Sequence, residues 1–190
     1  MIESSLWATA VKLYGHLKDS GYPFCFIGGL VVQRWGQPRM TGDVDATILC
    51  EFGDESRLAQ TFLDLYESRI EDPLAFATQA RILLLRDTNQ NRIDLSIGGI
   101  DFEHRVIARS SMWGVPCDQS IRTCGAEDLV VLKAFADRDQ DWIDIKNVLI
   151  RQGSHLDRDL IREELKPLIE LKEQPEILDR LESLFQATRK

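Results

Sequence analysis

The chain has 190 residues, of which 44% are hydrophobic and 28% are charged, and its formal net charge at pH 7 is −8. This composition is typical of a globular protein and excludes disordered and collagen-like chains. The negative charge excludes a general nucleic-acid coat, so any polyanionic partner must meet a local basic patch.

Hydropathy, the first residues and the cysteines indicate the cellular compartment. The longest apolar stretch, residues 22–32, is too short to span a bilayer, so we expect no membrane partner. Glu3 lies where a signal peptide would carry positive charge, and we therefore expect a cytoplasmic protein. Because no two cysteines form a close metal-binding pair, we expect reduced and mostly buried thiols at Cys25, Cys50, Cys117 and Cys124.

The amino-terminal half alternates helical and strand patterns, read from the spacing of apolar residues. Asp54 is a candidate helix cap, and residues 87–91 favour a turn that makes a hairpin of the strands on either side. In chain order, the expected elements are a helix over residues 4–20, a strand over 24–27, a short helix over 30–35, a strand over 43–50, a helix over 54–68 and strands over 81–86 and 92–97.

The carboxy-terminal half is mainly helical, with residues 114–123 as a candidate edge strand. We therefore predict an α/β (α+β) fold with a mixed β-sheet, flanking helices and a helical C-terminal half. As domains, we expect a catalytic core over residues 1–100 and a helical region over 101–190 packed on it. The expected helices of this half cover residues 102–110, 126–138, 142–151, 156–171 and 175–187.

Three aspartates share the polar faces of two predicted strands. Side chains alternate along a strand, so Asp43 and Asp45 lie on one side, with α-carbons about 7 Å apart, while their apolar neighbours face the core. Asp94 has the same phase in its own strand. If the two strands are neighbours, the three carboxylates meet, and their mutual repulsion favours a bound divalent cation such as Mg²⁺. The alternative is a solvated strand end.

Gly28 and Gly29 lie between a strand and a short helix, where a phosphate could approach the backbone amides and the positive helix end. The alternative for this pair is close packing of helix and strand. For Lys133 and Arg138, the alternative is surface pairing with Asp137 and Asp141 at helical spacing. The candidate ligands of a nucleotide are therefore Gly28, Gly29, Arg34, Arg39, Lys133 and Arg138.

Together these motifs give the chain a family resemblance. The diglycine, the run from Arg39 to Asp45 and the later Asp94 resemble the nucleotidyltransferase fold of the DNA polymerase β superfamily. Within it, the chain resembles the AbiEii/AbiGii toxin family, and the resemblance covers residues 24–149. The residues that carry this closer likeness are Phe102, Glu103, Arg109, Glu127, Asp128, Leu129, Lys133, Arg138, Asp141 and Asp144.

The resemblance implies transfer of a nucleoside monophosphate from a nucleoside triphosphate to an acceptor hydroxyl. Asp43 and Asp45 would hold two Mg²⁺ (or Mn²⁺) ions, and Asp94 would complete the metal site and help to activate the hydroxyl. Gly28 and Gly29 would cradle the β- and γ-phosphates. The tRNA-tailing CCA-adding enzymes carry an Arg-Asp pair where this chain has Val32 and Gln33, so template-free polymerisation is not expected.

The resemblance leaves the acceptor open. RNA, notably the acceptor end of tRNA, is the acceptor expected for a toxin of a toxin–antitoxin pair. A cognate toxin or antitoxin protein and a cationic small molecule of the aminoglycoside kind are alternatives. A non-enzymatic alternative is an inactive binding module of the same fold.

Overall fold

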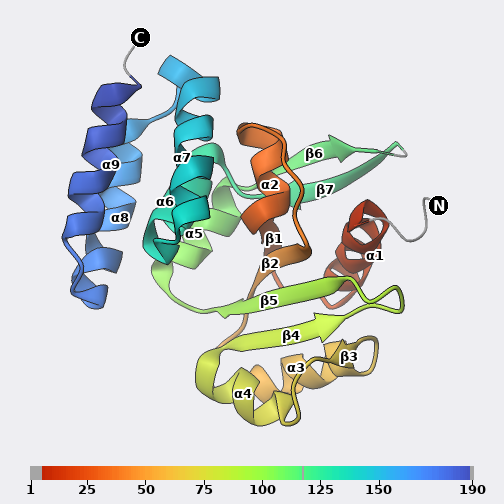
Figure 1. Ribbon diagram of the computed structural model, residues 1–190. Helices are drawn as coiled ribbons and strands as arrows, with labels where there is room; N and C mark the ends of the chain where they lie inside the picture. The colour runs from red at the N-terminus through yellow and green to blue at the C-terminus, as the bar shows by residue number, and fades with distance from the viewer. Residues whose placement is uncertain (1–5, 117, 189–190) are drawn as a thin grey trace. The chain divides into compact units, whose positions relative to one another are not determined.

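A computed structural model describes residues 6–116 and 118–188 (Figure 1). These residues form two compact units, one comprising residues up to 30 with 40–124 and the other residues 31–39 with 125 onward. The chain passes between the units three times: within one helix after Leu30, after Arg39 and after Cys124. The predicted domain division at residue 100 stays a prediction, and Glu3 and Cys117 lie outside the described residues.

A mixed sheet organises the first unit. In the described part of the chain it has seven strands in the order β3-β4-β5-β2-β1-β7-β6 (Figure 1). The pairs β2–β5 and β1–β7 are parallel, and the other neighbours are antiparallel. The predicted mixed sheet is therefore confirmed. The strands are β1 (Phe24–Ile27), β2 (Asp43–Leu49), β3 (Glu67–Ser68), β4 (Ile82–Arg86), β5 (Arg92–Gly98), β6 (Ser111–Val115) and β7 (Gln119–Thr123).

Helix α1 (Leu6–Asp19) buries Leu13 and Leu17 and packs against β2 and β7 of the sheet. The predicted first helix is confirmed over its described residues. Its predicted start at Ser4 lies outside them. Helix α2 (Gly28–Trp35) begins at the diglycine itself, two residues before the predicted start.

The predicted helix over residues 54–68 is wrong at its end. Helix α3 (Glu55–Leu63) stops early, and β3 then pairs with β4. Asp54 makes no capping hydrogen bond and instead pairs with Arg57 at 2.8 Å. Helix α4 (Pro73–Ala80) was not predicted, although Asp72 caps it by accepting from the Ala75 amide and Pro73 opens it.

The predicted edge strand over residues 114–123 is wrong as a single strand, because this range contains the end of β6 and the whole of β7. Strands β6 and β7 pair in antiparallel fashion, and β7 adds to β1 in parallel through Phe26 and Thr123. The sheet edge is therefore β6. Helix α5 (Asp101–Arg109) precedes this hairpin, and the Glu103 side chain accepts from the Gly99 and Ile100 amides at its start.

Helices make up most of the second unit. Helix α8 packs against α6 and α9, and α6 also packs against α7. Helix α6 ends before Asp137, which lies in the left-handed region with a φ of 56°. The next helix, α7, then begins at Asp139, three residues before its predicted start at Trp142. The other predicted helices are confirmed within a few residues. The elements are α6 (Ala126–Ala136), α7 (Asp139–Gln152), the short 3-10 helix η1 (Gly153–His155), α8 (Arg158–Lys172) and α9 (Glu176–Ala187).

Three cysteines, Cys25, Cys50 and Cys124, are free thiols and buried, as predicted. Between residues 6 and 188, leaving out residue 117, no helix has the length and apolar character needed to cross a bilayer. A cytoplasmic location stays a prediction.

Candidate active site

The three predicted aspartates converge on one face of the sheet. Strands β2 and β5 are parallel neighbours, and Asp45 lies directly beside Asp94 in their register. Residues at partner positions point to the same face, and Asp43 shares that face with Asp45. One carboxylate oxygen from each residue lies within 4.8 Å of the others. The condition set by the sequence, that the two strands are neighbours, is confirmed.

Burial of the opposite face fixes this arrangement. Val44 and Ala46 of β2 and Ile93 and Leu95 of β5 have no exposed surface, whereas the three aspartates are partly exposed. A slip of one residue in register would bury the carboxylates and expose the apolar side chains. The free energy of apolar burial therefore holds the carboxylates together despite their repulsion.

Neighbouring groups stabilise two of the three carboxylates. The Thr41 hydroxyl donates to Asp43 Oδ1 at 2.8 Å, and Arg69 forms an ion pair with Asp94. Burial raises the pKa of Asp94 above its usual value; Arg69 opposes this shift, and the charge of Asp43 adds to it. Arg69 was not predicted, because it follows the short strand β3, which has no periodic signal in the sequence.

The diglycine places the start of α2 against Asp45. Gly28 has a φ of +70°, and a Cβ at this position would lie 2.0 Å from Asp45 Oδ2. The Gly29 amide points at the same oxygen from 3.4 Å. The diglycine is thus closely packed, and the group against which it packs is the Asp45 carboxylate. The role of the diglycine in phosphate binding stays a prediction.

The carboxylates fit a divalent cation by their chemistry and spacing. Carboxylate oxygens are hard ligands, and two ligands on opposite sides of Mg²⁺ are about 4.2 Å apart. The observed spacing of up to 4.8 Å is close to this value, and the side chains are accessible to solvent. Small side-chain rotations would bring all three oxygens to an ion.

Three of the predicted cations of the second unit pair with two buried carboxylates, those of Asp141 and Asp144. Lys133 Nζ pairs with Asp141 at 2.8 Å and with Asp144 at 2.7 Å, and its side chain is only 5% exposed. Arg39 binds both oxygens of Asp144 at 2.8 Å. Arg138 pairs with Asp141 at 2.6 Å, as its helical spacing predicted.

The predicted partner of Lys133 was wrong, because Asp137 instead accepts a hydrogen bond from the Trp142 indole at 2.6 Å. Burial alone would raise the pKa values of Asp141 and Asp144, but their bonds to the cations outweigh it and lower both. Arg34 stacks on the Trp35 ring at 4.1 Å. Contact of these four cations with a nucleotide stays a prediction.

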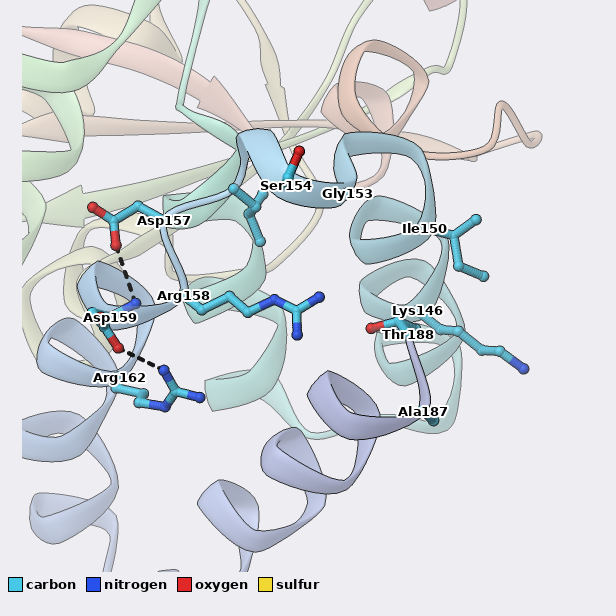
Figure 2. A pocket seen from close by; sticks show the side chains of 11 residues that line it. Lys146, Ile150, Gly153, Ser154, Asp157, Arg158, Asp159, Arg162, Ala187 and Thr188 are labelled. Carbon is cyan, nitrogen blue, oxygen red and sulfur yellow. Dashed lines mark hydrogen bonds and ion pairs between the residues drawn. The ribbon is translucent and has the colours of Figure 1, made fainter. Parts of the chain in front are cut away.

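The second unit also has a surface cavity of about 840 Å³ (Figure 2). Arg158 extends its guanidinium across it and donates to the Phe185 carbonyl oxygen, while Asp159 and Arg162 pair with each other in its wall. None of the predicted site residues lines this cavity. We therefore assign the candidate chemistry to the aspartates of the sheet.

Comparisons with known proteins identify the family and the fold of the chain. Residues 8–183 match the family described as "Nucleotidyl transferase of unknown function (DUF2204)". No curated protein matches the sequence. A nucleotidyltransferase-like antigenic protein from Paracoccidioides brasiliensis has a similar solved structure, with 12% identity and a TM-score of 0.52; 92% of this chain and 91% of that chain are covered.

The antibiotic-resistance factor ANT(2'')-Ia is also similar in structure. Its solution structure gives 13% identity and a TM-score of 0.55, covering 87% of this chain and 94% of that chain. Its complex with adenylyl-2''-tobramycin gives 16% identity and a TM-score of 0.52, covering 86% and 99%. Identities this low show the fold alone, and that fold is the one expected. The closer resemblance to AbiEii/AbiGii toxins stays a prediction.

Proposed function

Because the chain belongs to the nucleotidyl transferase family DUF2204, we propose that it transfers a nucleoside monophosphate from a nucleoside triphosphate to an acceptor hydroxyl, with Asp43, Asp45 and Asp94 at the reacting centre. The observation that carries this proposal is the convergence of three carboxylates within 4.8 Å, beside the start of a helix.

In this proposal Asp43, Asp45 and Asp94 hold two Mg²⁺ or Mn²⁺ ions. When bound, such ions neutralise the triphosphate and stabilise the entering and leaving oxygens. The protein positions the carboxylates that would hold the ions. Thr41 orients Asp43 by its hydrogen bond, and the absence of a side chain at Gly28 lets the start of α2 lie against Asp45. The amides of Gly28 and Gly29 would bind the β- and γ-phosphates at the positive end of α2.

The reaction forms a bond between the acceptor oxygen and the α-phosphorus and breaks the bond to the β-phosphate bridge, releasing pyrophosphate. Asp94 is the proposed acceptor of the hydroxyl proton. In the second unit, Arg34, Arg39, Lys133 and Arg138 are the proposed further contacts to nucleotide phosphates or RNA.

For the acceptor we propose RNA, with tRNA as the first substrate to test, as in a toxin of a toxin–antitoxin pair. A small cationic acceptor is the second candidate, because the chain carries a net charge of −8 and shares its fold with ANT(2'')-Ia, which was solved with adenylyl-2''-tobramycin. A cognate toxin or antitoxin protein is a further candidate acceptor.

The test is label transfer from each of the four α-³²P nucleoside triphosphates, with Mg²⁺ or Mn²⁺, to total tRNA or to tobramycin. We expect transfer by the wild-type protein and a loss of about 100-fold or more in Asp45→Asn. The matched control is Asp64→Asn, because the Asp64 side chain is exposed and accepts a hydrogen bond from Gln60 of its own segment. Undiminished transfer by Asp45→Asn, or none by the folded wild-type protein with any acceptor, would contradict the proposal.

A further inference from the structure

The sheet face that carries the three carboxylates also carries a group of arginines on one side of them. From β2, the sheet continues through β5, which carries Arg92, and β4, which carries Arg86. Arg69 follows the next strand, β3, and reaches Asp94. The diglycine lies on the opposite side of the carboxylates, after β1. We call Arg69, Arg86 and Arg92 the arginine row.

Register places two of these arginines directly opposite each other. Arg86 pairs with Arg92 across β4 and β5, so both side chains point to the face of Asp94. Like charges at directly opposite positions destabilise a sheet. Arg92 lies beside Asp43. Arg86 donates from Nη1 to Gln90 Oε1 at 3.0 Å, and its Nε lies 3.7 Å from Glu67 Oε2, which is too far for a hydrogen bond. The positive charges of Arg86 and Arg92 are therefore only partly neutralised by their neighbours, and an anion could bind beside them.

Unsatisfied donors point to the same conclusion. Over the described residues, three buried side-chain nitrogen or oxygen atoms have no hydrogen-bond partner, and two of them are the Nε atoms of Arg69 and Arg86. A buried donor without a partner is unfavourable. The guanidinium groups of Arg69 and Arg86 therefore have hydrogen-bonding capacity that the described residues leave unused.

The reaction geometry says which part of the substrate that ligand belongs to. In an in-line displacement, the attacking hydroxyl and the leaving pyrophosphate lie on opposite sides of the α-phosphorus. If the β- and γ-phosphates lie at Gly28 and Gly29, the acceptor arrives from the far side of Asp94. That side is formed by β5 and β4, where the arginine row lies.

We propose that the arginine row binds the phosphodiester backbone of an RNA acceptor whose hydroxyl reaches Asp94. This inference rests on the function proposed above and names its acceptor surface. The row is the local basic patch that an acidic chain needs in order to bind a polyanion. A cationic aminoglycoside would be repelled by the same guanidinium groups. The acids nearest the row are Glu67, which is 64% exposed, and Asp43 and Asp94, which belong to the proposed metal site.

The test compares binding of fluorescein-labelled tRNA, followed by fluorescence anisotropy over a series of KCl concentrations. The variants are Arg86→Gln, Arg92→Gln and the double variant, and the matched control is Arg57→Gln. Arg57 belongs to the same unit, is 69% exposed and pairs with Asp54. Circular dichroism melts establish that each variant is folded.

We expect the double variant to bind tRNA about tenfold or more weakly, and its plot of log K against log[KCl] to be shallower by about 1.4, from 0.7 per lost phosphate contact. Arg57→Gln should match the wild-type protein. Binding of ATP in the presence of Mn²⁺, measured by calorimetry, should be unchanged in all variants, because the row does not include the diglycine.

The inference would be overturned if the double variant bound tRNA with the same affinity and salt dependence as the wild-type protein. It would also be overturned if the wild-type protein bound Mn²⁺ and ATP but did not bind tRNA. Label transfer to tobramycin with none to RNA would also overturn it. Failure of the wild-type protein to bind Mn²⁺ or any nucleoside triphosphate refutes the proposed reaction instead. In that case the proposed RNA-binding surface is still supported if the double variant loses tRNA binding while Arg57→Gln retains it.

Discussion

Replacing Gly28 by alanine should damage the candidate site more than it damages the fold. The added Cβ would lie 2.0 Å from Asp45 Oδ2, 2.5 Å from its Cγ and 2.7 Å from its Cβ. None of these distances is possible for real atoms, so either Asp45 or the start of α2 must move. Because Asp45 is a proposed metal ligand, a shift of its side chain should weaken cation binding.

Two free-energy terms set the expected loss of stability. An alanine at a φ of +70° costs about 1–2 kcal/mol relative to glycine. Driving the Asp45 side chain away from its preferred rotamer adds about 0.5–1.5 kcal/mol. The free energy of unfolding should therefore fall by about 1.5–3.5 kcal/mol in Gly28→Ala, and Mn²⁺ affinity should fall by about tenfold or more.

Gly21 offers a matched control for the backbone term. Its φ is +76°, but a Cβ there would have nothing within 4 Å. Gly21→Ala should therefore lose only the first term, about 1–2 kcal/mol, and should bind Mn²⁺ as the wild-type protein does. The gain from a stiffer unfolded chain is the same for both variants and cancels in the comparison.

Urea denaturation gives the two free energies of unfolding, and electron paramagnetic resonance of free Mn²⁺ gives the two affinities. Equal loss of stability in both variants, together with wild-type Mn²⁺ binding by Gly28→Ala, would refute this reasoning. It would show that the helix start does not hold Asp45 in place.

Three further outcomes concern charge. Mn²⁺ should raise the melting temperature of the wild-type protein, EDTA should reverse the rise, and Asp45→Asn should show none, because ligand binding stabilises only the form that binds. Lys133→Met should lose about 3–5 kcal/mol in urea denaturation at pH 7, because two buried carboxylates lose their shared cation. Asp141 and Asp144 have lowered pKa values, so their contribution is complete above the unfolded value of about 3.9 and is lost as the pH falls through the folded values. The free energy of unfolding of the wild-type protein should thus decrease when the pH is lowered below 4, and the difference between the wild-type protein and Lys133→Met should become smaller. A difference that is equal at pH 7 and pH 3 would contradict this reasoning.

Local pattern was sufficient to predict much of the fold. Period-two alternation located β2 and β5 and assigned Asp43, Asp45 and Asp94 to their polar faces. Helical spacing located most helices within a few residues. Helix α4 was missed although its signals, a capping Asp72 followed by Pro73, are present in the sequence. Its short apolar pattern was too weak to separate it from the preceding helix.

Other features depend on contacts between distant segments. Lys133 lies on the same helix as Asp137, yet it pairs with aspartates of the next helix, because the packing of α6 on α7 buries its amine between them. Arg69 reaches Asp94 only because β3 and β4 extend the sheet beyond β5. No spacing along the chain encodes either contact.

By itself, the sequence determined which side chains point to which face, because alternation follows from the geometry of each extended backbone segment. The tertiary structure alone decided that β2 lies beside β5 in the register that joins Asp45 to Asp94. That choice depends on the apolar area buried by the whole sheet against its helices, a sum over many distant residues that no local pattern contains.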